Sequence, residues 1–223
     1  EPRVQGLQPA AASRRFPSYL APAMTQLPEL PLTLSRQEIR KMIRQRRRAL
    51  TPEQQQEMGQ QAATRMMTYP PVVMAHTVAV FLSFDGELDT QPIIEQLWRA
   101  GKRVYLPVLH PFSAGNLLFL NYHPQSELVM NRLKIHEPKL DVRDVLPLSR
   151  LDVLITPLVA FDEYGQRLGM GGGFYDRTLQ NWQHYKMQPV GYAHDCQLVE
   201  KLPVEEWDIP LPAVVTPSKI WEW

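Results

Sequence analysis

Residues 76–109, HTVAVFLSFDGELDTQPIIEQLWRAGKRVYLPVL, contain the pattern that decides the fold. The apolar run HTVAVFLSF predicts a buried strand, and KRVYLPVL predicts the next one. Between them, Thr90-Gln91-Pro92 predicts the start of a helix, IIEQLWRAG, which ends at Gly101. A strand, a helix and a strand joined by short connections predict a parallel sheet with crossover helices.

Further elements are predicted on both sides of this pattern. Ser35 with Glu38 three residues later forms a capping box that starts the basic helix LSRQEIRKMIRQRRRAL. Thr51 followed by Pro52 starts a second helix that runs to about Thr68. Downstream, strands are predicted in NLLFLNY, LDVLITPLVAF, QPVGYAHD and PAVVT, a helix in FYDRTLQNW, and less regular structure over residues 123–150. We predict a single three-layer, Rossmann-like α/β domain over residues 33–223, with a mostly parallel central sheet flanked by helices.

Residues 1–32 stand apart from this domain. They are rich in Pro, Ala and Arg, and after Glu1 they contain no acidic residue before Glu29. They show neither a clear helical or strand period nor the apolar core of a secretory signal. We expect a disordered or non-native N-terminal extension that lies outside the functional domain.

The amino-acid composition argues against several classes of protein and of site. The 223 residues carry a formal net charge of +1, which argues against wholesale nucleic-acid or membrane binding. A single cysteine excludes an intramolecular disulfide framework and a Cys-rich zinc site. No apolar run approaches the ~20 residues that a bilayer-spanning helix needs. We expect a cytoplasmic monomer whose partners are small molecules, not a membrane or a nucleic acid.

The stretch RLGMGGGFYDR, residues 167–177, is the strongest candidate site. Its glycines let backbone N–H groups face one concavity and let a phosphate approach the main chain without a side-chain clash. A helix that begins near Phe174 would add its positive end. The aromatic pair can stack on a flat ring, Asp176 can hold Mg²⁺, and Arg177 can pair with phosphate or with an acid. Glycines alone would fit a surface turn equally well, and the stretch matches neither common nucleotide-binding glycine motif.

The basic helix is the second candidate. Arg36, Arg40 and Arg44 (or Arg47) share one helix face by their spacing. That face fits polyphosphate capture, RNA binding or, with no function at all, a solvated helix surface.

The third candidate is FLSFDGELDT, residues 81–90, where a strand ends and three acids follow. Ligands bind at the carboxyl ends of strands in α/β sheets. Glu87 could accept hydrogen bonds from an amino-substituted ring, whereas Asp89 is expected to cap the next helix.

The histidines, the cysteine and Asp208 give weaker indications of a functional site. The six histidines show no metal-ligand spacing and are expected to be structural or exposed. His194 and Asp195 are neighbours, but neighbours in a strand point to opposite faces. Cys196 lies near no obvious activating base, and Asp208 stands where a turn residue before a late strand is expected.

Together these segments resemble a known family. The order of the basic helix, FLSFDGELDT, IHEP (135–138), RLGMGGGFYDR, and LPVEEWD (202–208) with VVT is similar to that of 5-formyltetrahydrofolate cyclo-ligases, also called 5,10-methenyltetrahydrofolate synthetases. The resemblance runs from about Ser35 to the C-terminus. The RLGMGGGFYDR element is its most specific part.

The resemblance implies one α/β domain that uses ATP and Mg²⁺ to cyclise 5-formyltetrahydrofolate to 5,10-methenyltetrahydrofolate through a phosphorylated formyl intermediate, with release of ADP and phosphate. It implies ATP contacts from Arg36, Arg40, Arg167, Leu168, Gly169, Met170, Gly171, Gly172, Gly173, Phe174 and Tyr175. It implies folate contacts from Leu82, Glu87, Met170, Gly171, Gly172, Gly173 and Phe174, metal binding by Asp176 and Asp208, and catalytic roles for Arg167, Gly171, Gly172 and Tyr175.

Two positions depart from the family pattern. Arg36 stands where the family often has lysine, so the charge remains while its geometry changes. Phe174 stands where tyrosine is frequent, which keeps stacking but removes the hydroxyl. Two other functions stay open on the residues alone: a non-catalytic RNA- or polyphosphate-binding protein that uses the arginine helix, and a sugar-phosphate isomerase or transferase that uses a general base without ATP.

Overall fold

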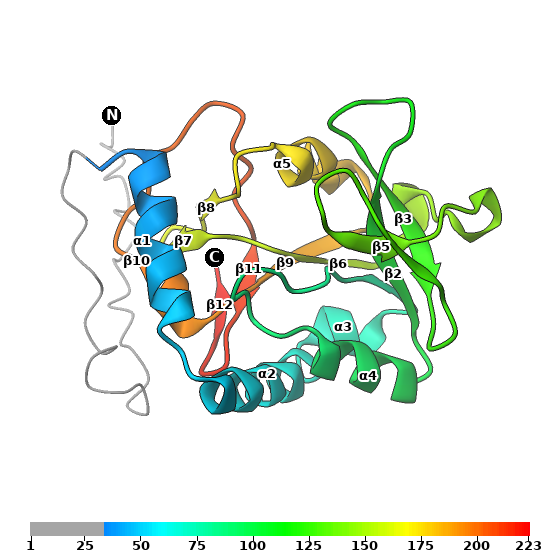
Figure 1. Cartoon of the computed structure of the whole chain (residues 1–223), viewed down its shortest axis with the longest axis horizontal. Helices are drawn as coiled ribbons and strands as arrows, with labels where there is room; N and C mark the ends of the chain where they lie inside the picture. Colours follow the sequence, from blue (N-terminus) through cyan, green and yellow to red (C-terminus); the bar gives the residue numbers. More distant parts are fainter. Residues whose placement is uncertain (1–33) are drawn as a thin grey trace, which may run out of the picture.

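The central sheet has seven strands in the order β12-β11-β9-β6-β1-β2-β3 (Figure 1). The computed structural model describes residues 34–223, so the prediction for residues 1–32 lies outside the described residues. The strands are β1 (Thr77–Ala79), β2 (Arg103–Leu109), β3 (Leu117–Tyr122), β6 (Val153–Thr156), β9 (Gln188–Tyr192), β11 (Ala213–Val215) and β12 (Ile220–Glu222). Neighbours from β11 to β2 pair in parallel, whereas the edge strands β3 and β12 pair antiparallel. The mostly parallel sheet predicted from the sequence is confirmed.

Three helices cover one face of this sheet, along the lower edge of the view in Figure 1. They are α2 (Pro52–Met66), α3 (Pro70–Met74) and α4 (Gln91–Arg99). Met66 and Leu97 pack in the same buried cluster as Val78 and Ile155 of the sheet. The expected start of α2 is confirmed, because Thr51 and Gln54 form a capping box; α3 was missed.

The other face is covered by mixed structure. Helix α5 (Phe174–Leu179) packs there with a small sheet of β10 (Leu198–Val199), β7 (Ala160–Asp162) and β8 (Arg167–Leu168). Helix α1 (Arg36–Arg48) lies outside that small sheet and buries Ile39 and Ile43 against it. Two helices and a small sheet therefore form this outer layer, which the sequence pattern predicted as helices alone.

Several boundaries differ from the sequence prediction. The predicted strand 76–84 ends at Ala79, and the chain then turns at Asp85 and Gly86, both of which have positive φ. The irregular segment 123–150 contains a hairpin of β4 (Leu128–Met130) and β5 (His136–Pro138). Short 3-10 turns cover Val142–Asp144, Leu148–Arg150, Trp182–His184 and Asp195–Gln197. Within the described part of the chain, no helix has both the length and the apolar character to cross a bilayer.

Candidate active site

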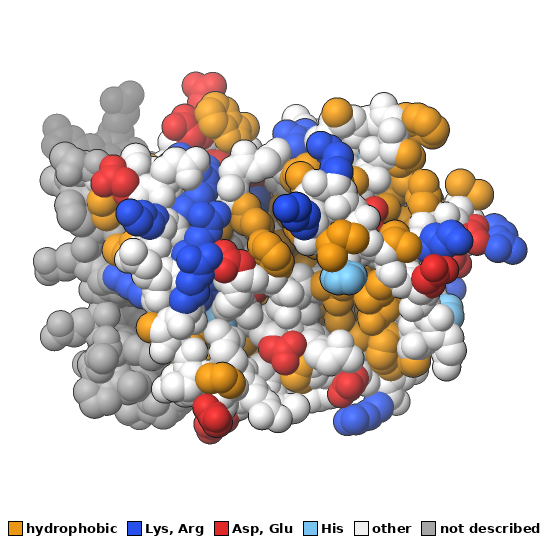
Figure 2. Space-filling model, viewed as in Figure 1, with side chains coloured by type: hydrophobic (Ala, Val, Ile, Leu, Met, Phe, Trp, Pro, Cys, Tyr) orange, Lys and Arg blue, Asp and Glu red, His pale blue; other side chains and the backbone are white. Residues whose placement is uncertain are grey.

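A cleft of about 480 Å³ lies where the candidate segments meet. One wall comes from α1 and the loop Gly169–Gly173, and the other from residues 81–87, β2, β3 and the β4–β5 hairpin. Figure 2 shows the basic side chains of α1 as a column along this face, with hydrophobic side chains gathered across from it over β2, β3 and β5. The predicted residues that line the cleft are Arg36, Arg40, Leu82, Glu87, Arg167, Gly169, Met170, Gly171, Gly172, Gly173, Phe174, Tyr175 and Asp176.

The glycine loop presents its main chain to the cleft. Within residues 34–223, the N–H groups of Met170, Gly171, Gly172 and Gly173 donate to no protein acceptor. Gly171 and Gly173 have φ of 109° and 71°, where a side chain would strain the backbone. A Cβ on Gly172 would stand 2.8 Å from the ring of Phe174. The loop therefore needs these glycines, and it offers free donors of the kind that bind phosphate.

Arginines hold this loop from two sides. Arg40 is buried, and its Nε donates to the carbonyl oxygen of Gly169 at 2.7 Å. Arg177 donates to the carbonyl oxygens of Gly172 and Gly115, each at 2.5 Å, so it ties the loop to residues 110–116. Among the described residues, Arg177 therefore bonds main-chain carbonyl oxygens and forms no ion pair with an acid.

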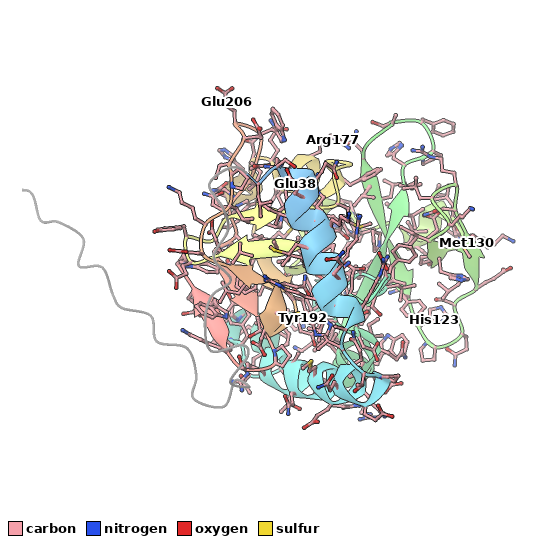
Figure 3. The ribbon with its side chains drawn as sticks, turned by 60° about the vertical axis from the view of Figure 1, so that its left-hand side comes forward. Glu38, His123, Met130, Arg177, Tyr192 and Glu206 are labelled. Atoms are coloured by element: carbon pink, nitrogen blue, oxygen red, sulfur yellow. The ribbon has the colours of Figure 1, made fainter. Side chains whose placement is uncertain are left out.

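The two predicted metal-binding acids each pair with an arginine. Asp176 Oδ1 accepts from Arg167 Nη2 at 2.7 Å and from the main-chain N–H of Ile209 at 3.2 Å. Asp208 accepts two bonds from Arg36, at 2.6 and 3.1 Å, and a third from the N–H of Glu205 at 2.8 Å. The bond from Ile209 to Asp176 brings the loop 203–209 to helix α5. Figure 3 places Glu206 of this loop at the same end of the molecule as Glu38 of α1.

Glu87 is the acid on the opposite wall. Its Oε1 accepts from the N–H of Phe84 at 2.9 Å. Burial raises the pKa of Glu87 to about 7, even though the nearby Arg47 guanidinium and the Phe84 N–H act to lower it. Tyr175, from α5, stands in the same electrostatic neighbourhood, and burial raises the pKa of its phenol far above the ordinary value. Tyr175 is therefore protonated at neutral pH and can donate a hydrogen bond.

Some predicted residues lie elsewhere. The Leu168 side chain is buried against Ile39 and Val199, so only its main chain can reach a nucleotide. Asp208 stands behind Arg36 and does not line the cleft. Thr90 is the N-cap of α4, and Asp89, one residue before it, accepts from the N–H of Gln91, so Asp89 supports the helix start without being its N-cap.

The histidine and cysteine at the end of β9 are structural. His194 is fully buried, and its Nε2 bonds the carbonyl oxygen of Gly86 at 3.1 Å, whereas Asp195 bonds Ser218. The two neighbours have separate partners, but they lie after β9 at a 3-10 turn and not in the strand that was expected. Burial raises the pKa of Cys196 to about 11, which leaves a thiol without nucleophilic character.

Sequence reasoning missed part of the cleft wall. Glu137 Oε2 accepts from the N–H of Leu109 and from Asn131 Nδ2, both at 3.0 Å. Glu137, Asn131 and His136 line the cleft, as does Trp207 beside Asp208. The IHEP element was noticed as a family feature, and it could have indicated Glu137; Trp207 adjoined a predicted ligand.

No complete metal cage is built from side chains in the part of the chain that the structure describes. Across residues 34–223, no three His, Cys, Asp or Glu side chains are grouped so that they could hold a metal ion. A cation here would need ligands from a bound molecule, such as phosphate oxygens.

Comparisons with known proteins agree on one family. The model of the 5-formyltetrahydrofolate cyclo-ligase family matches residues 33–217. The 5-formyltetrahydrofolate cyclo-ligase of Escherichia coli K12 is 98% identical over 182 residues, which cover 82% of this chain and 100% of that protein. The protein of the same name from Haemophilus influenzae is 52% identical over 179 residues, covering 80% of this chain and 96% of its own.

Solved structures support the same assignment. The NMR structure of the 5,10-methenyltetrahydrofolate synthetase of Aquifex aeolicus has a TM-score of 0.73 at 27% identity, covering 85% of this chain and 93% of that one. A methenyltetrahydrofolate synthetase of Mycoplasma pneumoniae has a TM-score of 0.66 at 21% identity and shares the fold, over 82% of this chain and 99% of its own. With a family model matched over most of its length, this chain belongs to the 5-formyltetrahydrofolate cyclo-ligase family.

Proposed function

We propose that this chain catalyses the ATP-dependent cyclisation of 5-formyltetrahydrofolate to 5,10-methenyltetrahydrofolate, with release of ADP and phosphate. One observation carries the proposal. A single cleft joins a glycine loop and three arginines on one wall to a half-buried acid, Glu87, and an apolar surface on the other, in a member of the cyclo-ligase family. The relatives named for this reaction support it.

The loop wall suits the triphosphate. Arg36, Arg40 and Arg167 would neutralise phosphate charge, and the free N–H groups of Gly171 and Gly172 would bind oxygens whose charge grows during transfer. Phosphoryl transfer needs positioning and charge neutralisation more than a protein nucleophile. The reaction is therefore compatible with a half-buried, protonated thiol and with scattered histidines.

The opposite wall suits the folate. Glu87 would accept hydrogen bonds from the amino-substituted pterin ring, and Leu82 and Leu106 offer apolar surface to its face. Met170 to Phe174 would touch both substrates, because the loop lies where the two walls meet. The Tyr175 phenol, protonated and close to Glu87, would donate a hydrogen bond at this junction.

Two bond exchanges complete the reaction. The formyl oxygen attacks the γ-phosphorus of ATP, the bond to the bridging oxygen breaks, and ADP leaves. The folate nitrogen at position 10 then attacks the activated formyl carbon and loses its proton, and the carbon–oxygen bond breaks as phosphate leaves. That nitrogen is already nucleophilic, so no protein base has to activate it.

Mg²⁺ is the expected partner of ATP here, and of the two candidate ligands Asp176 suits it better than Asp208. Asp176 Oδ2 has no hydrogen-bond partner within residues 34–223, so this carboxylate can take a cation that keeps its other ligands from phosphate and water. Both oxygens of Asp208 are occupied by Arg36 and Glu205, so Asp208 fits only if Arg36 moves. When bound, Mg²⁺ would neutralise charge on the phosphate oxygens.

The alternative of RNA or polyphosphate binding by the arginine helix is not favoured. Arg36 and Arg40 line the cleft beside the glycine loop, whereas Arg44 and Arg48 pair with Asp85, so these arginines do not form one continuous exposed face for a nucleic acid. A sugar-phosphate isomerase or transferase is not favoured, because the cyclo-ligase family model matches residues 33–217. We further propose that the enzyme acts as a monomer in the cytoplasm.

The test is direct. Purified protein is mixed with 5-formyltetrahydrofolate and MgATP, and methenyltetrahydrofolate is followed by its near-ultraviolet absorbance. Asp176→Ala should abolish product, whereas Asp141→Ala, which removes a partly exposed acid that pairs with Arg143 and does not line the cleft, should not. No product from a folded wild-type protein that binds ATP would overturn the proposal. Product that persists in Asp176→Ala would keep the reaction and remove Asp176 from the metal site.

A further inference from the structure

Arg47 is an unusual buried cation. It is 3% exposed, and its Nε has no hydrogen-bond partner among the described residues. None of the ion pairs formed within residues 34–223 includes it. Buried arginines are normally paired, because an uncompensated charge in the interior costs several kcal/mol. We therefore expect the buried charge of Arg47 to act on a nearby acidic group.

The Arg47 side chain lies directly behind the turn that carries Glu87. A Cβ on Gly86 would stand 3.3 Å from the Cβ of Arg47. Gln55 Nε2 donates to the carbonyl oxygens of both Arg47 and Gly86, at 3.4 and 3.3 Å, and His194 bonds the same Gly86 oxygen. Helices α1 and α2 and the end of β9 thus clamp this turn from outside the cleft.

Among the charged groups around Glu87, Arg47 is the cation that favours its ionisation. Asp85, in the same turn, is already paired with Arg48 at 2.7 Å and with Arg44 at 3.8 Å. His194 is neutral at physiological pH, since burial lowers its pKa to about 4. The Tyr175 phenol from α5 is uncharged. Asp85 opposes ionisation of Glu87, and Arg47 is the largest influence that favours it.

We propose that Arg47 is a positioning residue for folate binding: its buried guanidinium, behind the turn, favours the carboxylate form of Glu87 in the cleft. The inference rests on the proposed function for the assignment of Glu87 to folate. Arg47 does not line the cleft, so it acts through Glu87 and touches neither substrate. Packing behind the turn does not by itself require an arginine at position 47, because a neutral side chain of similar length would fill the space without the cost of a buried charge.

The first experiment compares Arg47→Met, Arg47→Lys and wild type. The dissociation constant of 5-formyltetrahydrofolate is measured without ATP between about pH 6 and about pH 9. Loss of the cation should move the acidic limb of this profile upward by about one pH unit, a weakening of about fivefold at pH 7 that vanishes at about pH 9. The turnover number at saturating folate should stay near that of wild type, since only binding is affected. Arg47→Lys should keep the wild-type profile.

Arg48→Met is the matched control. It removes a neighbouring cation from the same turn, but Arg48 is 62% exposed, and its pair with Asp85 is screened by solvent. Its profile should not move. Equal shifts in Arg48→Met and Arg47→Met, or loss of turnover in Arg47→Met and Arg47→Lys alike without a pH shift, would show that Arg47 only supports the fold of the turn.

A second measurement separates this inference from the proposed reaction. The side-chain carboxyl of Glu87 is titrated by carbon NMR in the free enzyme, assigned through Glu87→Gln. An unchanged titration in Arg47→Met would overturn the inference even if the enzyme converts folate. A wild-type enzyme that binds no folate would refute the proposed function, while the same titration still decides whether Arg47 governs Glu87. If Arg47→Met does not fold, Arg47→Gln replaces it in both measurements.

Discussion

Arg36 and Asp208, 172 positions apart, form a two-pronged ion pair with Nη1–Oδ2 at 2.6 Å and Nη2–Oδ1 at 3.1 Å. The pair joins the first turn of α1 to the loop before β11. The family pattern assigns both residues to the same ligand, Arg36 to the phosphates and Asp208 to the metal. In the structure they satisfy each other, so binding of MgATP would have to draw them apart or use Arg36 donors that Asp208 leaves free.

Asp208→Asn tests that competition. Because the amide holds Arg36 less strongly, we expect ATP without Mg²⁺ to bind several-fold more tightly than in wild type, while the gain from added Mg²⁺ shrinks. Asp176→Asn should lose the Mg²⁺-dependent gain and show no rise in Mg²⁺-free affinity. Isothermal titration calorimetry with ATP, with and without chelator, measures the Mg²⁺-free affinity and the gain in affinity that Mg²⁺ gives. Weaker Mg²⁺-free binding by Asp208→Asn would mean that Asp208 orients Arg36 toward the phosphates.

Gly171→Ala tests the loop geometry. At φ of 109° an alanine is strained, and a shifted loop would misplace the donors. We expect kcat/KM for ATP to fall by about 10-fold to 100-fold. Gly101→Ala is the control: it has φ of 74° and open space around its Cβ, at the end of α4. Both variants should lose about 1 kcal/mol of unfolding free energy, but only Gly171→Ala should lose activity. Equal kinetics in the two would remove the loop from the reaction.

Truncation tests the first turns of α1. A chain that begins at Met42 lacks Arg36, Arg40 and the buried Ile39, together with the Ser35–Glu38 capping box. We expect it to lose about 3 kcal/mol or more of unfolding free energy and to show no thermal stabilisation by MgATP. A chain that begins at Leu34 should match the full-length protein in both measurements. Nucleotide binding by the shorter chain would contradict the phosphate role of Arg36 and Arg40.

Glu87→Gln tests the cost of ionising the half-buried Glu87. The pKa of Glu87 rises from 4.5 to about 7 on folding, so its contribution to stability is fully present below about pH 4.5 and is lost as the pH rises through 7. At about pH 8 the variant should therefore exceed wild type by on the order of 3 kcal/mol, and at about pH 4.5 the two should be equal. Urea unfolding at both values measures this. His194 titrates in both proteins, so it cancels. A difference independent of pH would show that Glu87 is not the titrating group.

Local patterns in the sequence carried much of the architecture. The order of strand, helix and strand over residues 76–109, the capping box at Ser35 and the helix start at Thr51 form as predicted, although the first strand is shorter, because propensity, capping and apolar periodicity act over a few residues. The hairpin β4–β5 and strands β8, β10 and β12 were missed. Each spans two or three residues, too short for a period, and each exists because a partner strand lies beside it.

The candidate site divides in the same way. The sequence by itself determined the residue types: a glycine run that leaves N–H groups free, arginines spaced along one helix, and an acid after a strand. Only the tertiary structure decided their partners. It paired Arg36 with Asp208 and buried Arg47 behind the turn of Glu87 with no ion pair among residues 34–223. It also placed the Leu168 side chain in the core and brought Glu137 into the cleft. Ion pairing and burial depend on distances between residues that are remote in the chain, and no local pattern encodes those distances.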